Sequence, residues 1–412
     1  MNIKHTKKPE QRIDVKYLSS LGIKTYGADN LYPQELHDIV YSSPAGRTCL
    51  ERRTTYIEGN GLASQSLSDF VCNPAGETVD DVHSLLSADC AEYEGIAIHV
   101  NYNIAGNIVS LAAVPFDCCR LEEEDEAGVI SHIIYHPDWR GKKTRNGKSV
   151  KVDKSSIEIF PVFNPDPEIV QAQIIAAGGI EFYKGQILYV SRAGRLRYPT
   201  PLVDAVLTDM STDEGLSNVS NRNVRNNFLA GGILWVKRGQ LRPLPPEGSE
   251  EVFNEDGRPG PGGSGDPKRQ ESDEFIEAIE ALQGDTNACK IAVCEGEVDE
   301  EKPELISFAP KNFDKDFDST KKSVIETIYA AFNQEMFARL RTGSIGFSGD
   351  LANDVKKEYC EQVTKYQRML TRAYNLVFSR WEPDDNAPFT GVADVAVEPL
   401  ISSVTTNTDE EK

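Results

Sequence analysis

Residues 312–381 constrain the fold of this chain more than any other stretch. Apolar residues recur there every three or four positions, which is the spacing of one helical face. Before a short break they are Phe313, Phe317, Val324, Ile325, Ile328, Tyr329, Phe332, Met336 and Leu340; after it they are Leu351, Val355, Tyr359, Val363, Tyr366, Leu370, Tyr374 and Val377. The pattern predicts two helices of about 28 residues, each on the order of 40 Å long. A typical globular helix has only about 11–12 residues. Helices as long as these usually line, cross or connect other parts of a structure.

The break between the two predicted helices, residues 341–350, carries a glycine at every third position. Glycine adopts backbone conformations closed to other residues, so we expect a flexible loop there.

The charge of the chain limits its choice of partners. The net charge is −21, which argues against a basic surface that grips nucleic acid but does not exclude a protein past which DNA slides. Acidic residues outnumber basic ones about three to one between residues 240 and 310, whereas residues 312–381 are close to balanced. Such asymmetry suggests that the two segments face different surroundings.

The chain carries no sequence signal for membrane insertion or export. No apolar run approaches the roughly 20 residues that span a bilayer, and the basic N-terminus is not followed by an apolar stretch. We therefore expect a soluble protein that is not secreted. The cysteines have no metal-binding spacing, so we expect reduced thiols rather than a zinc site; they are Cys49, Cys72, Cys90, Cys118, Cys119, Cys289, Cys294 and Cys360.

The N-terminal half of the chain predicts helices followed by strands. Residues 1–27 are expected to form an arm that becomes ordered only against a partner. A helix over residues 33–53 should be kinked or split at Pro44-Ala45-Gly46, and Thr78 should cap a second helix over 79–92. Alternating apolar residues then predict an antiparallel sheet with strands at residues 96–102, 108–114, 129–136, 157–162 and 186–191, and with charged hairpin ends at 122–128 and 142–154. Residues 28–195 should thus form one α+β unit.

The second half predicts a small acidic unit inserted between long helices. A helix should run over residues 202–229, followed by a strand at 233–237 and a mobile loop at 239–271. A short helix (274–282) and two strands (290–294 and 305–308) on either side of an acidic turn should complete the insertion. After the long helices we expect one strand at 392–397 and a disordered tail beyond Ser403.

No motif in the sequence indicates catalysis, a metal or a cofactor. The run Gly260–Gly265 lacks the lysine and the preceding strand of a phosphate-binding loop, and its prolines remove N–H donors. The acidic runs at 122–126 and 295–304 lack a histidine or a separated third ligand, so we interpret them as solvated turns. His132 and His136 lie on a predicted strand, where they share a face but stand too far apart to bind one metal.

Three stretches resemble the portal (connector) proteins of tailed bacteriophages. Tyr198-Pro199-Thr200-Pro201-Leu202, with the helix that ends in Asn226-Asn227-Phe228-Leu229-Ala230-Gly231-Gly232, is similar to the stem helix of that family and its exit into a strand. Residues 290–293, 308–310 and 324–332 resemble the return from the clip to the stem, and residues 351–378 resemble the last long helix. Asn30-Leu31-Tyr32-Pro33 is a weaker match. The chain departs from many relatives in lacking a proline-containing turn after Phe332, which leaves the start of the tunnel loop uncertain by several residues.

The resemblance implies a portal-type α+β fold. It divides the chain into a flexible N-terminal arm (1–27), an α+β wing (28–200), a first stem helix (201–230), a clip (231–310), a second stem helix (311–341), a tunnel loop (342–350), a long helix (351–381) and a short crown strand with a disordered tail (382–412).

The resemblance also implies a function without enzymatic activity. Portals form a homo-oligomeric ring, usually of twelve copies, at one capsid vertex of the virion, after synthesis in the cytoplasm of the host bacterium. Double-stranded DNA is packaged and ejected through the channel. The implied partners are the large subunit of terminase, a head-tail adaptor and the major capsid or scaffold protein, with no membrane and no cofactor.

Two groups of candidate site residues follow from the resemblance. The DNA-facing tunnel loop and its base would comprise Arg339, Arg341, Thr342, Gly343, Ser344, Ile345, Gly346, Phe347, Ser348 and Gly349. Partner docking at the clip would involve Phe275, Ile279, Glu295, Glu297, Asp299 and Glu300. An acidic ring would repel phosphates and lower the friction on a moving duplex, while the two arginines would touch phosphates transiently.

Two alternatives remain open at this point. Scattered acids would also suit a metal-dependent DNA-processing enzyme such as a nuclease. A non-portal helical scaffold or adaptor of the same particle is the other alternative, and it would form elongated assemblies or rings without a duplex-sized channel.

Overall fold

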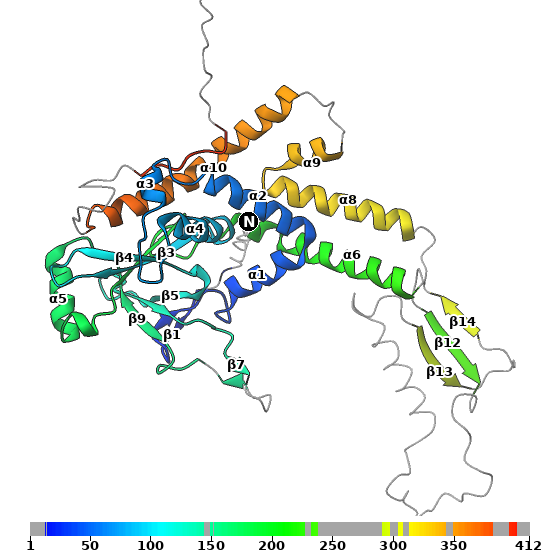
Figure 1. Ribbon diagram of the computed structural model, residues 1–412. Helices are drawn as coiled ribbons and strands as arrows, with labels where there is room; N and C mark the ends of the chain where they lie inside the picture. Colours follow the sequence, from blue (N-terminus) through cyan, green and yellow to red (C-terminus); the bar gives the residue numbers. More distant parts are fainter. Residues whose placement is uncertain are drawn as a thin grey trace, which may run out of the picture. The chain divides into compact units, whose positions relative to one another are not determined.

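The computed structural model describes residues 13, 15–143, 149–150, 152–226, 232–237, 291–296, 304–307, 313–342, 349–381 and 395–401 (Figure 1). The chain divides into two compact units. Unit 1 combines residues 1–210 with residues 326–412, and unit 2 is the intervening stretch 211–325. Helices and mainly antiparallel sheets occur in the same chain, so the predicted α+β class is confirmed.

Unit 1 begins with four helices. They are α1 (Tyr32–Ser42), α2 (Pro44–Glu58), α3 (Gln65–Ser68) and α4 (Val79–Tyr93). The starts of α1, α2 and α4 were predicted from the sequence, whereas the short helix α3 was not. The predicted split at Pro44 is confirmed: Ser43 caps α2 by accepting a hydrogen bond from the Gly46 amide, and Pro44 occupies the first turn, where no N–H is needed. The predicted cap at Thr78 is also confirmed, because Thr78 and Asp81 form a reciprocal capping box.

The predicted strands form two sheets rather than one. The first has the order β11-β10-β3-β4, and the second has the order β1-β2-β5-β6-β9. The bounds in the first sheet are β3 (Gly95–Tyr102), β4 (Ile108–Val114), β10 (Gln186–Ser191) and β11 (Gly194–Arg195). In the second they are β1 (Tyr17–Leu18), β2 (Ile23–Lys24), β5 (Cys119–Glu122), β6 (His132–Tyr135) and β9 (Glu158–Pro161). The charged segment 142–150 forms a separate short hairpin of β7 (Lys142–Lys143) and β8 (Ser149–Val150).

The chain passes from one sheet to the other at Pro115. This residue ends β4 because proline cannot donate a ladder hydrogen bond, and the 3-10 turn η1 (Phe116–Cys118) then redirects the backbone into β5. Alternation of apolar residues identifies strands but not their sheet, which explains why a single sheet was expected.

Two expectations for the N-terminal half are wrong. Part of the expected arm belongs to the fold, since β2 pairs with β5 and Ile23 is completely buried. A helix not anticipated from the sequence, α5 (Pro167–Ala177), lies between β9 and β10 and is followed by the 3-10 turn η2 (Ile180–Phe182). Its signals are ordinary ones: Asp166 caps its N-terminus, and Gly178 ends it in a left-handed conformation.

The predicted pair of long helices consists of three helices. They are α8 (Phe313–Ala331), α9 (Glu335–Thr342) and α10 (Gly349–Phe378). The first predicted helix of about 28 residues is therefore wrong, because it is interrupted at residues 332–334; the second is confirmed and contains 30 residues. Upstream, the predicted helix at 202–229 begins as the 3-10 turn η3 (Leu202–Val206) and continues as α6 (Leu207–Asn226), and residues 227–231 lie outside the described part.

Unit 2 contains a small mixed sheet. Its strands are β12 (Gly232–Lys237), β13 (Ile291–Gly296) and β14 (Glu304–Ser307), in the order β13-β12-β14. All three strands were predicted. β12 runs parallel to β13 and antiparallel to β14, so the two strands that flank the acidic stretch do not pair as a hairpin. The predicted loop at 239–271 and the predicted helix at 274–282 lie outside the described residues.

The expected C-terminal strand is wrong within the described residues 395–401. Val397 makes a single antiparallel bridge to Leu62, and Val395 donates its amide to Asn375 of α10. The bridge partner of Val397, Leu62, lies in the turn between α2 and α3. This turn is too short for the pairing to continue as a strand. Residues beyond 401 lie outside the described part.

No helix in the described ranges is long and apolar enough to cross a membrane. The six cysteines that the structure describes are free thiols and buried, at positions 49, 72, 90, 118, 119 and 360. Burial raises the pKa of the Cys49 thiol to about 12, which keeps it protonated and unreactive at neutral pH.

Candidate functional site

The break between α8 and α9 sets the direction in which the chain approaches α10. Asn333 ends α8 in the left-handed region with φ of 54°. The Gln334 amide donates to the Tyr329 carbonyl at 2.8 Å, and the Asn333 amide donates to the Ala330 carbonyl at 2.9 Å. This pair of bonds is a Schellman motif, with asparagine at the position usually taken by glycine. The apolar stripe continues through Phe332, which is buried, so the interruption leaves no mark on the periodicity.

The Gln334 side chain fastens this break to two other helices. It is fully buried, and its amide nitrogen donates to the Cys49 carbonyl of α2 at 2.9 Å and to the Tyr359 hydroxyl of α10 at 2.7 Å. Its amide oxygen accepts a hydrogen bond from Arg52 at 3.1 Å. Every polar atom of the amide therefore has a partner, as a buried polar group requires.

An aromatic cluster next to Gln334 holds α9 against α2 and α10. The rings of Tyr56, Phe337 and Tyr359 meet edge to face, with centroids 4.9–6.0 Å apart. The Arg52 guanidinium lies 4.7 Å from the centre of the Phe337 ring. Burial raises the pKa of Tyr359 to about 12, so its hydroxyl stays protonated. These contacts fix both helices that lead into the predicted tunnel loop.

The structure describes some of the residues that were predicted to face DNA. Arg339 is exposed on α9, Arg341 and Thr342 belong to the last turn of α9, and Gly349 is the first residue of α10. The arginines predicted at the base of a loop are thus helical. The other members, Gly343, Ser344, Ile345, Gly346, Phe347 and Ser348, lie outside the described residues.

Most of the predicted clip group lies outside the described residues. Glu295 belongs to β13. Phe275, Ile279, Glu297, Asp299 and Glu300 fall in the undescribed stretches of unit 2, as does the glycine-rich run at 260–265.

A buried ion network that sequence reasoning missed joins α10 to the first sheet and to α2. Glu94, only 3% exposed, accepts hydrogen bonds from Arg53 at 2.8 Å, from the Tyr366 hydroxyl at 2.6 Å and from Arg192 at 3.3 Å. Burial opposes the charged form of Glu94, but these three donors outweigh it and lower its pKa. Arg53 also lies 4.5 Å from the centre of the Tyr366 ring. No local signal reveals these pairs, because they are separated by 41 to 272 residues.

A second buried arginine holds the N-terminal lead-in against the second sheet. Arg120 is fully buried and donates to the Asn30 side chain at 2.6 Å, to the Asn30 carbonyl at 2.8 Å and to the Asp117 carbonyl at 2.7 Å. Its ring partner is Trp139, at 4.8 Å from the guanidinium. Asn30 belongs to the sequence Asn30-Leu31-Tyr32-Pro33 and has a positive φ of 69°, so this motif has a structural role in shaping the turn before α1.

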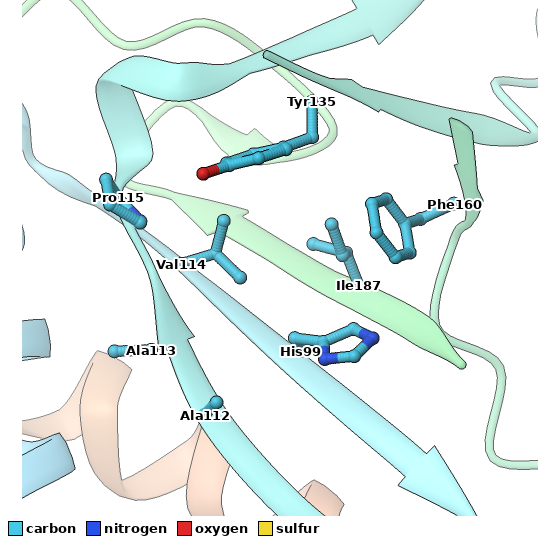
Figure 2. Close-up of a pocket in the computed structure, with 8 residues that line it drawn as sticks. All are labelled: His99, Ala112, Ala113, Val114, Pro115, Tyr135, Phe160 and Ile187. Carbon is cyan, nitrogen blue, oxygen red and sulfur yellow. The ribbon is translucent and has the colours of Figure 1, made fainter. Parts of the chain in front are cut away.

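A cavity of 230 Å³ lies between the two sheets (Figure 2). It is lined by His99, Ala112, Ala113, Val114, Pro115, Tyr135, Phe160 and Ile187. Nε2 of His99 donates to the Lys184 carbonyl at 2.7 Å, and burial lowers the pKa of the imidazole, so the ring is neutral. The lining contains no carboxylate, cysteine or serine, and its only ionisable side chains are those of His99 and Tyr135.

The histidines and acids singled out in the sequence have structural partners. Nδ1 of His132 lies 2.8 Å from Glu122, and the His136 ring lies against Trp139. In the described ranges, no group of three or more histidine, cysteine or acidic side chains is arranged to hold a metal ion.

No protein-family model matches the chain, and no curated protein matches it. Among solved structures it is similar to a chain of the virion of a native gene transfer agent particle, with 14% identity, a TM-score of 0.46, and coverage of 90% of this chain and 84% of the other. It is similar to a chain in the neck of the native particle computed with C12 symmetry, with 14% identity, a TM-score of 0.44, and coverage of 90% and 85%.

A third similar structure is an HK97 family phage portal protein from Corynebacterium diphtheriae, with 11% identity, a TM-score of 0.31, and coverage of 72% and 75%. The solved structures thus include a member of the class that the sequence resembles. All of these TM-scores lie below 0.5.

Proposed function

We propose that this chain is the subunit of a phage portal, a homo-oligomeric ring at one capsid vertex through which double-stranded DNA is packaged and ejected. In this proposal the α+β part of unit 1 is the wing, and α6 and α8 form the stem. Unit 2 carries the clip that docks terminase and head-tail adaptors, and residues 343–348 form the tunnel loop.

The anchoring of α9 to α10 is the observation that carries the proposal. A six-residue linker with two glycines joins two helices that Gln334 and the aromatic cluster hold in place. A segment that contains glycine can adopt backbone conformations closed to other residues, and between fixed ends it can do so without disturbing the fold around it. This is the property expected of a loop past which a duplex moves.

The acidity of the chain supports the same role. With a net charge of −21, a ring of copies would repel phosphates over most of its surface, so a duplex inside it would move rather than adhere.

Imaging of the purified full-length protein tests the proposal. Negative-stain electron microscopy, with mass photometry for the copy number, should show closed rings whose channel admits a B-form duplex. Monomers, open filaments or rings without such a channel would overturn the proposal. Mg²⁺-dependent cleavage of duplex DNA by monomers would instead favour the nuclease, and elongated helical assemblies would favour the scaffold or adaptor.

The proposed tunnel loop has a separate test. Replacing Arg339 and Arg341 together with alanine should reduce DNA packaging and retention severalfold, because transient phosphate contacts at the base of the linker are lost. Packaged DNA protected from nuclease is the measurement, in particles complemented with the variant. Lys154→Ala, at an exposed loop position of unit 1, is the control. Unchanged packaging with the double variant would show that the arginines have no such role.

A further inference from the structure

The exposed face of α10 changes sign along its length. Residues at spacings of three and four share one helical face, and the exposed ones here begin with acids and end with bases. The acidic members are Asp354, Glu358 and Glu361; the basic members, which we call the basic stripe, are Lys365, Arg368 and Arg372.

Among the residues that the structure describes, the basic stripe has no ion-pair partner of opposite charge. Within the described part of the chain, no carboxylate forms an ion pair with any of its three residues. Lys365 instead lies 5.0 Å from the centre of the Tyr366 ring, beside Arg192 at 5.7 Å from the same ring. The nearest buried acid, Glu94, is already bound by Arg53 and Arg192. In a chain of net charge −21, an unpaired cluster of cations is a surface that an anionic partner would satisfy.

The same unit carries a surface of opposite charge. The turn between β5 and β6 begins with five consecutive acids, which we call the acidic tip: Glu122, Glu123, Glu124, Asp125 and Glu126. Lys24 binds Glu124, and His132 binds Glu122. Glu126 is exposed and has no ion-pair partner among the described residues, so the tip keeps an excess of negative charge.

The two surfaces lie on different sides of unit 1. α10 packs on α2 and α4, which belong to the helical layer over the first sheet, whereas the acidic tip extends from the second sheet. Figure 1 shows α10 along the upper edge of this unit, with β1 and β9 of the second sheet below β3 and β4. Complementary patches on different sides of one subunit make a heterologous contact, which can repeat from copy to copy until a ring closes.

We propose that the basic stripe of one copy binds the acidic tip of the neighbouring copy and that this contact joins subunits of the assembly. The inference rests on the proposed ring and adds the surface through which its subunits recognise one another. A second copy fits the stripe better than DNA does, because each copy supplies the acids that the stripe lacks, while the net charge of the whole chain repels a duplex.

Charge reversal on the stripe tests the contact. We expect Arg368→Glu with Arg372→Glu to raise the protein concentration at half-assembly about tenfold or more, because each subunit contact would then bring like charges together. Mass photometry over a concentration series gives this value. Lys356→Glu with Lys357→Glu is the matched control, since it reverses two positive charges at exposed positions of the same helix outside the stripe. Circular dichroism establishes that the variants are folded.

A charge swap makes the test specific. Adding Glu123→Lys and Glu126→Lys to the stripe variant should restore assembly at the wild-type concentration. If the stripe variant forms rings at the same concentration as the wild type, the proposed contact between stripe and tip is wrong. The same holds if the swap does not restore rings that the stripe variant has lost. Neither result would contradict the proposed ring itself. A wild-type protein that forms no ring would overturn the proposed function itself. If the stripe variant keeps its ring but loses binding to labelled duplex, the face contacts DNA and the inference is wrong.

Discussion

At the scale of single residues, Glu94 shows how a buried charge ties distant segments together. A carboxylate that is 3% exposed is stable only because three donors surround it. Those donors come from α2, from the turn after β10 and from α10, so one side chain connects segments far apart in the sequence. Loss of the charge would leave two arginines without their acceptor.

Glu94→Gln should therefore destabilise the protein. We expect a loss of about 3 kcal/mol, which lowers the Tm by about 5–10 °C at pH 7 in differential scanning calorimetry. Glu181→Gln, at an exposed position outside the acidic tip, should change stability by no more than about 0.5 kcal/mol.

The effect should also depend on pH in a defined direction. Because folding lowers the pKa of Glu94 below its ordinary value of 4.5, its stabilising contribution is present above that value and is lost as the pH falls through the lower pKa of the folded state. The difference in Tm between wild type and Glu94→Gln should shrink as the pH falls below 4.5. Buried His83, whose pKa is also lowered, is common to both proteins and cancels in the comparison. A difference that stays constant down to pH 3 would contradict the assignment.

Residue-level sequence reasoning finds local partners and misses remote ones. The Thr78 cap and the split at Pro44 were predicted because their partners lie within three residues. The partners of Glu94 and Gln334 lie up to 285 residues away and cannot be read from spacing. Glutamate at 94 looks like an ordinary helix end, and only the fold shows that it is buried.

At the scale of secondary-structure elements, the break between α8 and α9 decides where the proposed tunnel loop begins. Periodicity could not reveal it, because Phe332 and Met336 continue the apolar stripe across the interruption. The left-handed conformation of Asn333 is the local cause, and asparagine is among the few residues that tolerate it.

The stability of variants at Asn333 should fall as the energetic cost of a left-handed conformation rises for the substituted residue. Asn333→Gly should leave the Tm unchanged or slightly higher, since glycine adopts positive φ without strain. Asn333→Ala should lower stability by about 1 kcal/mol, and Asn333→Val by more, because β-branched residues are the least tolerant. Thermal unfolding of the three variants gives the order. Equal Tm values for glycine and valine would show that the break does not depend on this backbone conformation.

At the scale of the whole molecule, the sequence predicted the α+β class but not the layers. The acidic stretch between residues 240 and 310, predicted as an insertion, falls within the unit formed by residues 211–325. The division of the strands into two sheets was missed, because it depends on the turn at Pro115 and on the completely buried Ile23, which draws the N-terminal segment into the second sheet. Alternation reports which residues are buried in a strand; it does not report which strands are neighbours.

The anchoring of residues 395–401 beside α2 has a consequence for biosynthesis. Unit 1 is completed only by segments that follow residue 325, including α10 and the bridge between Leu62 and Val397. The 115 residues of unit 2 must therefore be translated first, and at about 5–20 residues per second this takes on the order of ten seconds. Throughout that interval the surface of α2 and α4 lacks its covering helix, so unit 1 cannot complete its folding before α10 and residues 395–401 have been synthesised.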